Sequence, residues 1–273
     1  MGRRLRVFLR WGLEGRLWTF SLIFAFCFLW EILARLQVGS FFFWDFMVPP
    51  SKSLATFYSL LTQPPYQEYD ILYHSGTTLW RAGVALMGGV LVAVPVGFAL
   101  GWWRALDAVF TPLFEFLRPT PSLIFFPILI LLFGTGSVSK IMASLIAVSF
   151  VMVINSLYGV KSTDSVLINS LRTMGASNAD ILRKAVLYSA LPHIASGIRV
   201  SIGASILVIV STEMIQGKEG LGFVIYFALD RLQFDHMWSG ILATLLVGAG
   251  AVYLWQYVEK KVLKWHFETT ARA

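Results

Sequence analysis

Apolar residues fill most of this chain in six long stretches that short polar segments separate. A helix needs about 20 apolar residues to cross the hydrocarbon core of a bilayer. Judged by that length, the pattern predicts membrane-spanning helices at residues 17–36, 78–103, 110–133, 141–160, 193–216 and 237–258. We therefore expect an all-α, polytopic membrane protein with residues 1–16 and 259–273 outside the bilayer.

The third and fifth of these stretches contain charges or helix breakers. Besides Glu115 and Arg118, the third carries four prolines: Pro112, Pro119, Pro121 and Pro127. Broken helices are tolerated at membrane depth only where protein or a watery cavity satisfies the freed backbone. The break near Pro121 and Phe125 is therefore a candidate lining of a translocation pathway.

Composition and charge distribution support a membrane location. The chain is 57% hydrophobic and 14% charged, against about 25% charged residues in a typical soluble domain. If the N-terminus is cytoplasmic, fourteen of the 22 lysines and arginines lie on the inner side, and four lie in outer segments. This asymmetry predicts that both termini are cytoplasmic. It also explains the net charge of +7 without a nucleic acid partner.

One polar segment, residues 161–192, interrupts the apolar pattern between the fourth and fifth spans. Its first part repeats apolar residues at helical spacing up to Met174. Gly175 fits the left-handed position that ends a helix. Ser177 and Asp180 have the spacing of a capping box, and Pro192 marks the expected entry to the fifth span. We expect two short cytoplasmic helices joined by a glycine turn; a plain connecting loop with some helicity is the alternative.

The motifs of this region resemble those of ABC importer permeases. Their cytoplasmic loop reads Glu-Ala-Ala, three residues and Gly, and here Gly175 matches the glycine while Asn169 stands at the acidic position. Tyr188 stands where a proline is usual. The stretch "RPTPSLIFFPILILLFGTGSVSK" at residues 118–140 is similar to the signature of nitrate, sulfonate, taurine and bicarbonate permeases. The segments "GIRVSIG", "GLGFVI" and "VLKWH" fit the same family.

This resemblance implies a type I importer permease fold and a division of labour among subunits. Two permease copies, here a homodimer, would pair in the bacterial inner membrane. Two cytoplasmic ATPases would bind ATP and Mg²⁺, and an extracytoplasmic binding protein would deliver a small solute. The chain contains no G-x-x-x-x-G-K-[ST] phosphate loop, so we expect no cofactor in it and no ATP hydrolysis by that route.

The resemblance also assigns the polar segment as the ATPase-coupling loop, near residues 166–188. The coupling residues that we expect are Gly175, Ala176, Ser177, Asn178, Asp180, Ile181 and Leu182. In this interpretation the helices around residues 175–182 move as rigid bodies when ATP closes the ATPase dimer. The spans then alternate between inward-open and outward-open states.

Several polar residues and glycines inside or beside the spans are candidates for the pathway or its gate. Glu213 stands out because a carboxylate within a span is costly and often functional. It would lie at the outer gate, or pair locally with Lys218. Ser211, Thr212 and Asn155 would face solute or form hydrogen bonds between helices. Gly220 and Gly222 belong to the turn that follows Glu213.

Other residues carry structural expectations. Ser51 or Ser53 would cap a short helix in the first outer segment. Gly88, Gly89, Gly97 and Gly101, with Pro95, predict close packing of the second span against a neighbour, and Gly248 and Gly250 do the same for the sixth. Arg118 and Arg199 would extend to the membrane interface; a pair with Glu115 is the alternative for Arg118.

Alternative functions remain open at this point. The four histidines show no metal-ligand spacing, so no metal site is predicted, and no catalytic constellation for an intramembrane enzyme is visible. A secondary transporter or channel without an ATPase is the alternative from a different class. Within the permease class, the solute is either an anion such as nitrate or a sulfonate, or an uncharged heterocycle such as a vitamin precursor.

Overall fold

The structure, a computed structural model, describes residues 2–36, 46–62, 70–117 and 119–265, with side chains from residue 18 onward. Within these residues all regular elements are helices, so the all-α prediction is confirmed. They are α1 (Gly2–Leu36), α2 (Pro50–Thr62), α3 (Ile71–Trp102), α4 (Arg104–Leu117), η2 (Ser122–Phe125), α5 (Phe126–Phe133), α6 (Ser137–Lys161), α7 (Ser165–Thr173), α8 (Asn178–Ile181), η3 (Leu182–Val186), α9 (Leu187–Gln216), α10 (Leu221–Asp230) and α11 (Phe234–Val262).

Five helices in the described part of the chain are long and apolar enough to cross a bilayer. They include α1 from Trp18, α3, α6, α11 and the continuous helix Asn178–Gln216. A sixth span arises if α4 and the segment Ser122–Phe133 are one span, because they pass the same test together across an 87° bend. The bend lies beside Pro119 and Pro121, as expected for residues that cannot continue a helical hydrogen-bond ladder. Pro112, in contrast, lies inside α4.

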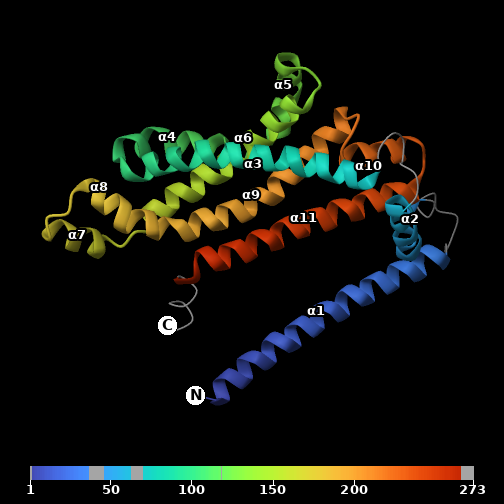
Figure 1. Cartoon of the computed structure of the whole chain (residues 1–273), viewed down its shortest axis with the longest axis horizontal. Coiled ribbons are helices and arrows are strands. Elements are labelled where there is room, and N and C mark those ends of the chain that lie inside the picture. Colours follow the sequence, from blue (N-terminus) through green and yellow to red (C-terminus); the bar gives the residue numbers. More distant parts are fainter. Residues whose placement is uncertain (1, 37–45, 63–69, 118, 266–273) are drawn as a thin grey trace.

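The centre of the molecule is the packing of α3 against α6 and of α6 against α9 (Figure 1). Glycines on α3 allow the first contact: a Cβ atom on Gly97 would lie 2.5 Å from the Ser156 Cβ, and one on Gly101 would lie 2.6 Å from the Val160 Cβ. The predicted close packing of the second span is therefore confirmed. The close packing predicted for the sixth span, α11, is not found, because nothing lies within 4 Å of a Cβ on Gly248 or Gly250 in the described structure.

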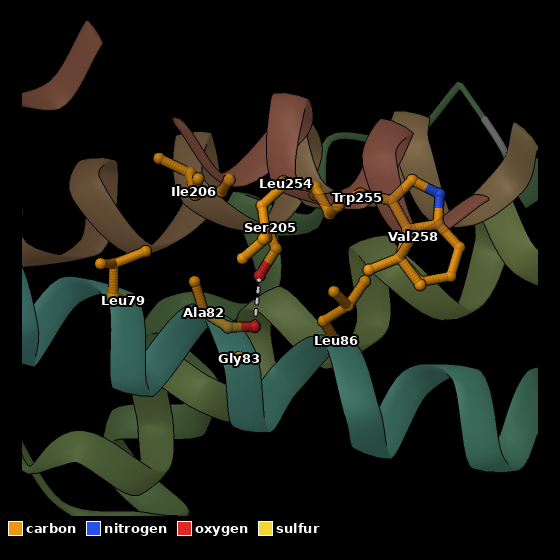
Figure 2. A pocket seen from close by; sticks show the side chains of 11 residues that line it. Leu79, Ala82, Gly83, Leu86, Ser205, Ile206, Leu254, Trp255 and Val258 are labelled. Atoms are coloured by element: carbon orange, nitrogen blue, oxygen red, sulfur yellow. Dashed lines mark hydrogen bonds between the residues drawn. The ribbon is translucent and has the colours of Figure 1, made fainter. Parts of the chain in front are cut away.

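A buried pair of serines joins the three central helices. Ser144 and Ser205 share a hydrogen bond of 2.8 Å, and Ser205 Oγ donates to the Ala82 carbonyl at 3.0 Å. Beside them, α3, α9 and α11 enclose a mostly apolar crevice of about 260 Å³, which Trp255 and Leu86 help to line (Figure 2). The serine contacts show how polar side chains inside a membrane bundle satisfy one another between helices.

The fifth span does not begin where the sequence predicted. Instead of entering at Pro192, the helix runs without a break from Asn178 to Gln216, through a π-helical turn at Leu182–Val186. Pro192 lies inside α9. A proline removes one hydrogen bond of the ladder, and packing outweighs that loss here because Ala190, Ile194 and Ala195 are all buried around it. The second short helix of the polar segment is thus one end of a span.

The first two helices meet at a polar contact that the sequence did not suggest. Instead of a serine cap, Glu31 of α1 accepts hydrogen bonds from the Ser51 backbone at 3.0 Å and from its hydroxyl at 2.7 Å. The predicted caps were wrong because α2 begins at Pro50, so neither serine precedes it. Beyond this contact α1 runs apart from the other helices (Figure 1), and its apolar side chains from Trp18 to Leu29 are exposed.

Arg199 differs from its prediction as well. It pairs with Glu259 of α11, whose side chain is buried, instead of extending alone to the interface. Arg118, for which a pair with Glu115 was the alternative, lies outside the described residues; Glu115 accepts a hydrogen bond from the Tyr158 hydroxyl.

Candidate functional site

Hydrogen bonds at both ends of α7 shape the polar segment between α6 and α9. The Asp164 side chain accepts a hydrogen bond from the Val166 backbone and starts α7. At the other end of α7, Gly175 has φ of 79°, and its N–H donates to the Arg172 carbonyl at 3.0 Å. The Ala176 N–H donates to the Leu171 carbonyl at 3.0 Å. These two bonds define a Schellman motif, the geometry that the sequence predicted for Gly175.

The next helix begins at Ser177. Its hydroxyl oxygen accepts a hydrogen bond from the Asp180 N–H at 3.2 Å, and the hydroxyl donates to the Asp180 carboxylate at 2.6 Å. Asp180 also pairs with Lys184 at 3.2 Å. The chain therefore reverses direction over residues 174–177 with both helix ends satisfied, which makes the turn a rigid projection from the bundle.

One side of this projection is anchored and the other is exposed. Ile181 is fully buried in the same core cluster as Leu157 and Val186. It was predicted among the coupling residues, but its side chain is inaccessible to a partner and holds the helix to the bundle instead. Val166 and Met174 are exposed to 67% and 75%. Gly175, Ser177 and Asn178 are also exposed, while Ala176, Asp180 and Leu182 are half-buried.

Tyr188, the residue that departs from the family pattern, contacts the C-terminal end of the described chain. Its ring lies edge-on to that of Trp265 at 6.3 Å between centroids. An aromatic side chain at this position thus connects the first turn of α9 to the segment after α11.

A second polar cluster surrounds Glu213 at the other end of α9. The Glu213 side chain is buried and forms an ion pair with Arg81 of α3 at 2.8 Å. It also accepts hydrogen bonds from the Thr78 hydroxyl at 2.8 Å and the Gly222 N–H at 3.1 Å. The predicted local pair with Lys218 is therefore wrong, because the buried carboxylate faces α3.

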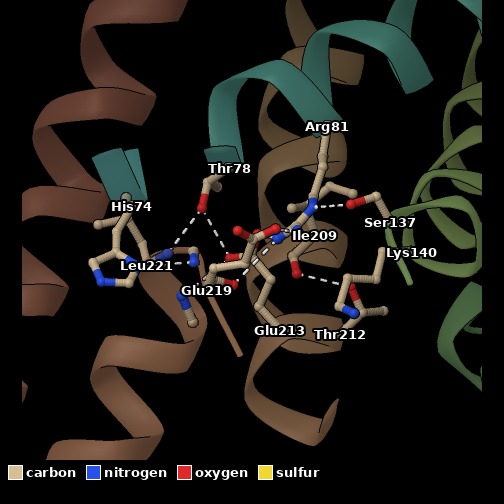
Figure 3. Close-up of polar contacts among 12 residues, drawn as sticks. His74, Thr78, Arg81, Ser137, Lys140, Ile209, Thr212, Glu213, Glu219 and Leu221 are labelled. Carbon is tan, nitrogen blue, oxygen red and sulfur yellow. Dashed lines mark hydrogen bonds and ion pairs between the residues drawn. The ribbon is translucent and has the colours of Figure 1, made fainter. Parts of the chain in front are cut away.

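Arg81 connects three segments of the chain (Figure 3). Besides Glu213, its guanidinium pairs with Glu219, and its Nε donates to the Ser137 hydroxyl of α6 at 3.0 Å. Glu219 in turn accepts a hydrogen bond from the Tyr73 hydroxyl at 2.8 Å. A guanidinium suits this position because its planar fork can hold two carboxylates at once.

The turn at residues 217–222 is locked onto α3 by its backbone. The Gly220 N–H donates to His74 Nδ1 at 3.0 Å, and the Leu221 N–H donates to the Thr78 hydroxyl at 2.9 Å. Gly220 has φ of 103°, and a Cβ atom there would lie 2.2 Å from the Glu213 carboxyl carbon. Both the backbone conformation and the close approach therefore require glycine.

Only some of the predicted pathway residues lie in the Glu213 cluster. Glu213, Gly220 and Gly222 lie together, whereas the Thr212 hydroxyl donates to the Ile209 carbonyl within α9. The Ser211 hydroxyl donates to the Leu207 carbonyl, and the Asn155 amide donates to the Val151 carbonyl of α6. Pro121 is exposed in the bend before η2, and Phe125 packs partly buried beside Phe126.

Sequence reasoning did not identify four members of the cluster: His74, Thr78, Arg81 and Glu219. A signal for the first three was present. They recur at positions i, i+4 and i+7 of α3, which places them on one face of an otherwise apolar helix. An arginine at the edge of a predicted span also calls for a named acidic partner, and Glu213 was available.

These features define an α-helical membrane protein with a rigid projection at one end of its central bundle and a buried ion-pair cluster at the other. Residues 85–264 match the family model described as "Binding-protein-dependent transport system inner membrane component". The chain belongs to this family of ABC transporter permeases, so the class suggested by the sequence motifs is confirmed.

Individual relatives agree with that assignment. The chain is 29% identical over 88% of its length to the taurine transport system permease protein TauC of Escherichia coli, covering 86% of that protein. It is 30% identical over 69% of its length to the bicarbonate transport system permease protein CmpB of Synechococcus elongatus, covering 67% of that protein. Among solved structures, an inward-facing MetNI methionine ABC transporter chain matches with a TM-score of 0.60 and 20% identity. That match covers 71% of this chain and 94% of the other, and it shows the type I permease fold.

Proposed function

We propose that this chain is the permease subunit of an ATP-driven importer for a small solute of the sulfonate, taurine, nitrate or bicarbonate kind. Two copies would pair in the membrane, and an extracytoplasmic binding protein would deliver the solute. Two cytoplasmic ATPases would bind ATP and Mg²⁺, leaving this chain without a cofactor or a catalytic role. The names of the taurine and bicarbonate relatives support the solute class, and the family description supports a binding-protein partner.

One observation supports the energy-coupling part most directly. The projection at residues 164–178 exposes Val166 and Met174, although its helix ends are fully capped and Ile181 fixes it to the core. An exposed apolar surface on a rigid element is typical of a protein interaction site. A rigid projection also suits coupling, because a movement of the ATPase would be transmitted to α9 without loss in a flexible loop.

Alternating access follows from this arrangement. The turn at residues 174–177, which we call the coupling turn, and the Glu213 cluster lie at opposite ends of one continuous helix, Asn178–Gln216. Movement of the coupling turn as the ATPases close would therefore tilt this helix, whose other end carries the Glu213 cluster. Both termini, α7 and the coupling turn would lie in the cytoplasm, which agrees with the positive-inside distribution of charge.

The experiment replaces the exposed apolar surface. The double variant Val166→Asp/Met174→Asp should insert normally but lose co-purification with the ATPase, because two charges would have to be buried at the interface. Leu232→Asp is the matched control, since Leu232 is 69% exposed but lies between α10 and α11. Retained co-purification and ATP-driven uptake in the double variant would contradict this docking surface.

The same purification addresses the alternative of a secondary transporter or channel. Such a protein would be isolated without an ATPase and would be driven by an ion gradient instead of ATP.

A further inference from the structure

A polar cavity of about 520 Å³ opens beside the Glu213 cluster, between α3, the start of α6 and the turn after α9. Its lining includes Arg81, Ser137, Lys140, Gly217, Lys218 and Glu219. It differs from the crevice at Ser205, whose lining is almost entirely apolar. The charges in the cavity therefore indicate what kind of ligand it could hold.

The two carboxylates near the cavity share one guanidinium, that of Arg81, and Lys140 supplies the second positive charge nearby. Glu213 is enclosed by Arg81, Thr78 and the Gly222 N–H, and Glu219 shares the Arg81 guanidinium. Neither one needs a cationic ligand. The carboxylates are thus part of the frame that shapes the cavity, with Arg81 held between them.

Lys140 is in a different situation. Lys140 is 3% exposed, and its ammonium donates to the carbonyls of Thr135 at 2.9 Å and Gly136 at 3.3 Å. No carboxylate of the described residues lies within the 4.0 Å of an ion pair. Glu213 and Glu219 act on the Lys140 charge from beyond that distance, and its direct hydrogen-bond acceptors are the two neutral carbonyls. The third proton of the ammonium is available to an acceptor in the cavity.

The backbone adds to this positive character. Lys140 lies in the first turn of α6, a 25-residue helix that begins after Gly136 without a side-chain cap. The first N–H groups of a helix have no partner within the helix and attract anions. A buried cation beside a helix N-terminus therefore leaves two positive features facing one cavity, and the exposed Lys218 lies at its edge.

We propose that Lys140, with the N-terminus of α6, binds the monoanionic oxyanion headgroup of the transported solute, a sulfonate or carboxylate. This inference rests on the proposed import function and names the solute-binding residue within it. Glu213, Arg81 and Glu219 position the turn that closes one side of the cavity.

The test measures thermal unfolding of the full chain, purified in a phosphate-free detergent so that no lipid headgroup supplies an oxyanion. The probes are methanesulfonate, acetate and the neutral methanesulfonamide, at ionic strength matched with sodium chloride. Methanesulfonate should raise Tm of the wild type in a saturable manner, and methanesulfonamide should not. Acetate should also raise Tm, because the proposed headgroup is a sulfonate or a carboxylate.

The variants locate the effect. Lys140→Met should weaken the apparent affinity for methanesulfonate about tenfold or more, because a charge-assisted hydrogen bond is lost. Lys140→Arg should retain stabilisation by the anion. Lys52→Met is the matched control, since it removes a charge from an exposed outer lysine elsewhere. If Lys140→Met does not fold, the comparison of probes on the wild type and Lys140→Arg still decides the question.

Equal stabilisation of wild type and Lys140→Met by methanesulfonate would overturn the proposal, as would stabilisation by methanesulfonamide or none at all. Failure here leaves the proposed function standing, because ATPase co-purification and ATP-driven uptake do not depend on Lys140 binding an anion. Failure of those assays with intact anion binding would instead contradict the import function.

Discussion

At the scale of single residues, Arg81 and Glu213 form a buried ion pair in which each charge depends on the other. Removing one partner leaves a buried charge with less compensation, and such changes cost about 3–5 kcal/mol. We expect Arg81→Met and Glu213→Leu each to destabilise the protein by that amount. The double variant should be no less stable than the worse single variant, because it removes both charges. Unfolding in detergent, monitored by circular dichroism, gives the three free energies.

Additive losses in the double variant would contradict this coupling. Glu219→Gln is a suitable control, because Glu219 shares Arg81 but its side chain is 32% exposed. Water can replace part of that interaction, so we expect a loss of about 1 kcal/mol or less.

The same residues show what a sequence can reveal about the site. Glu213 could be identified because a carboxylate in an apolar stretch is conspicuous by itself. Arg81 was overlooked because it lies at the edge of the expected span, where a basic residue is ordinary. The structure identifies its partner by placing α3 and α9 side by side, in a contact between residues 132 positions apart. The Gly220 backbone conformation likewise followed from structure alone.

At the scale of helices, glycines set the distance between α3 and α6. A Cβ on Gly97 would collide with the Ser156 Cβ and the Val153 carbonyl, both at 2.5 Å. Gly97→Val should therefore force the two helices apart and lower Tm markedly, by the equivalent of several kcal/mol. Gly83→Val is the matched control on the same helix, because nothing lies within 4 Å of its Cβ. Similar melting temperatures of the two variants would contradict the role of Gly97 in packing.

Helix boundaries were the least predictable feature at this scale. Local signals located the turn at Gly175 and Ser177 correctly, because caps depend on nearby residues and their backbone. The same kind of signal failed at Pro192, where buried neighbours on other helices keep α9 continuous. Tertiary packing decides whether a proline ends a helix, and sequence periodicity does not contain that information.

At the scale of the whole molecule, the helix Asn178–Gln216 determines the topology. Its 39 residues correspond to about 58 Å at 1.5 Å per residue, well beyond the hydrocarbon thickness of about 30 Å. The coupling turn and the turn after Gln216 should therefore emerge on opposite sides of the membrane.

In a Cys27→Ser background, which removes the only cysteine, single cysteines at Met174 and Asp230 would report both sides. Both positions are exposed. With a membrane-impermeant maleimide on spheroplasts, we expect labelling of Asp230→Cys at once and of Met174→Cys only after permeabilisation. Immediate labelling of Met174→Cys would place the coupling turn outside, where no ATP is supplied, and would contradict the orientation on which the proposed coupling depends.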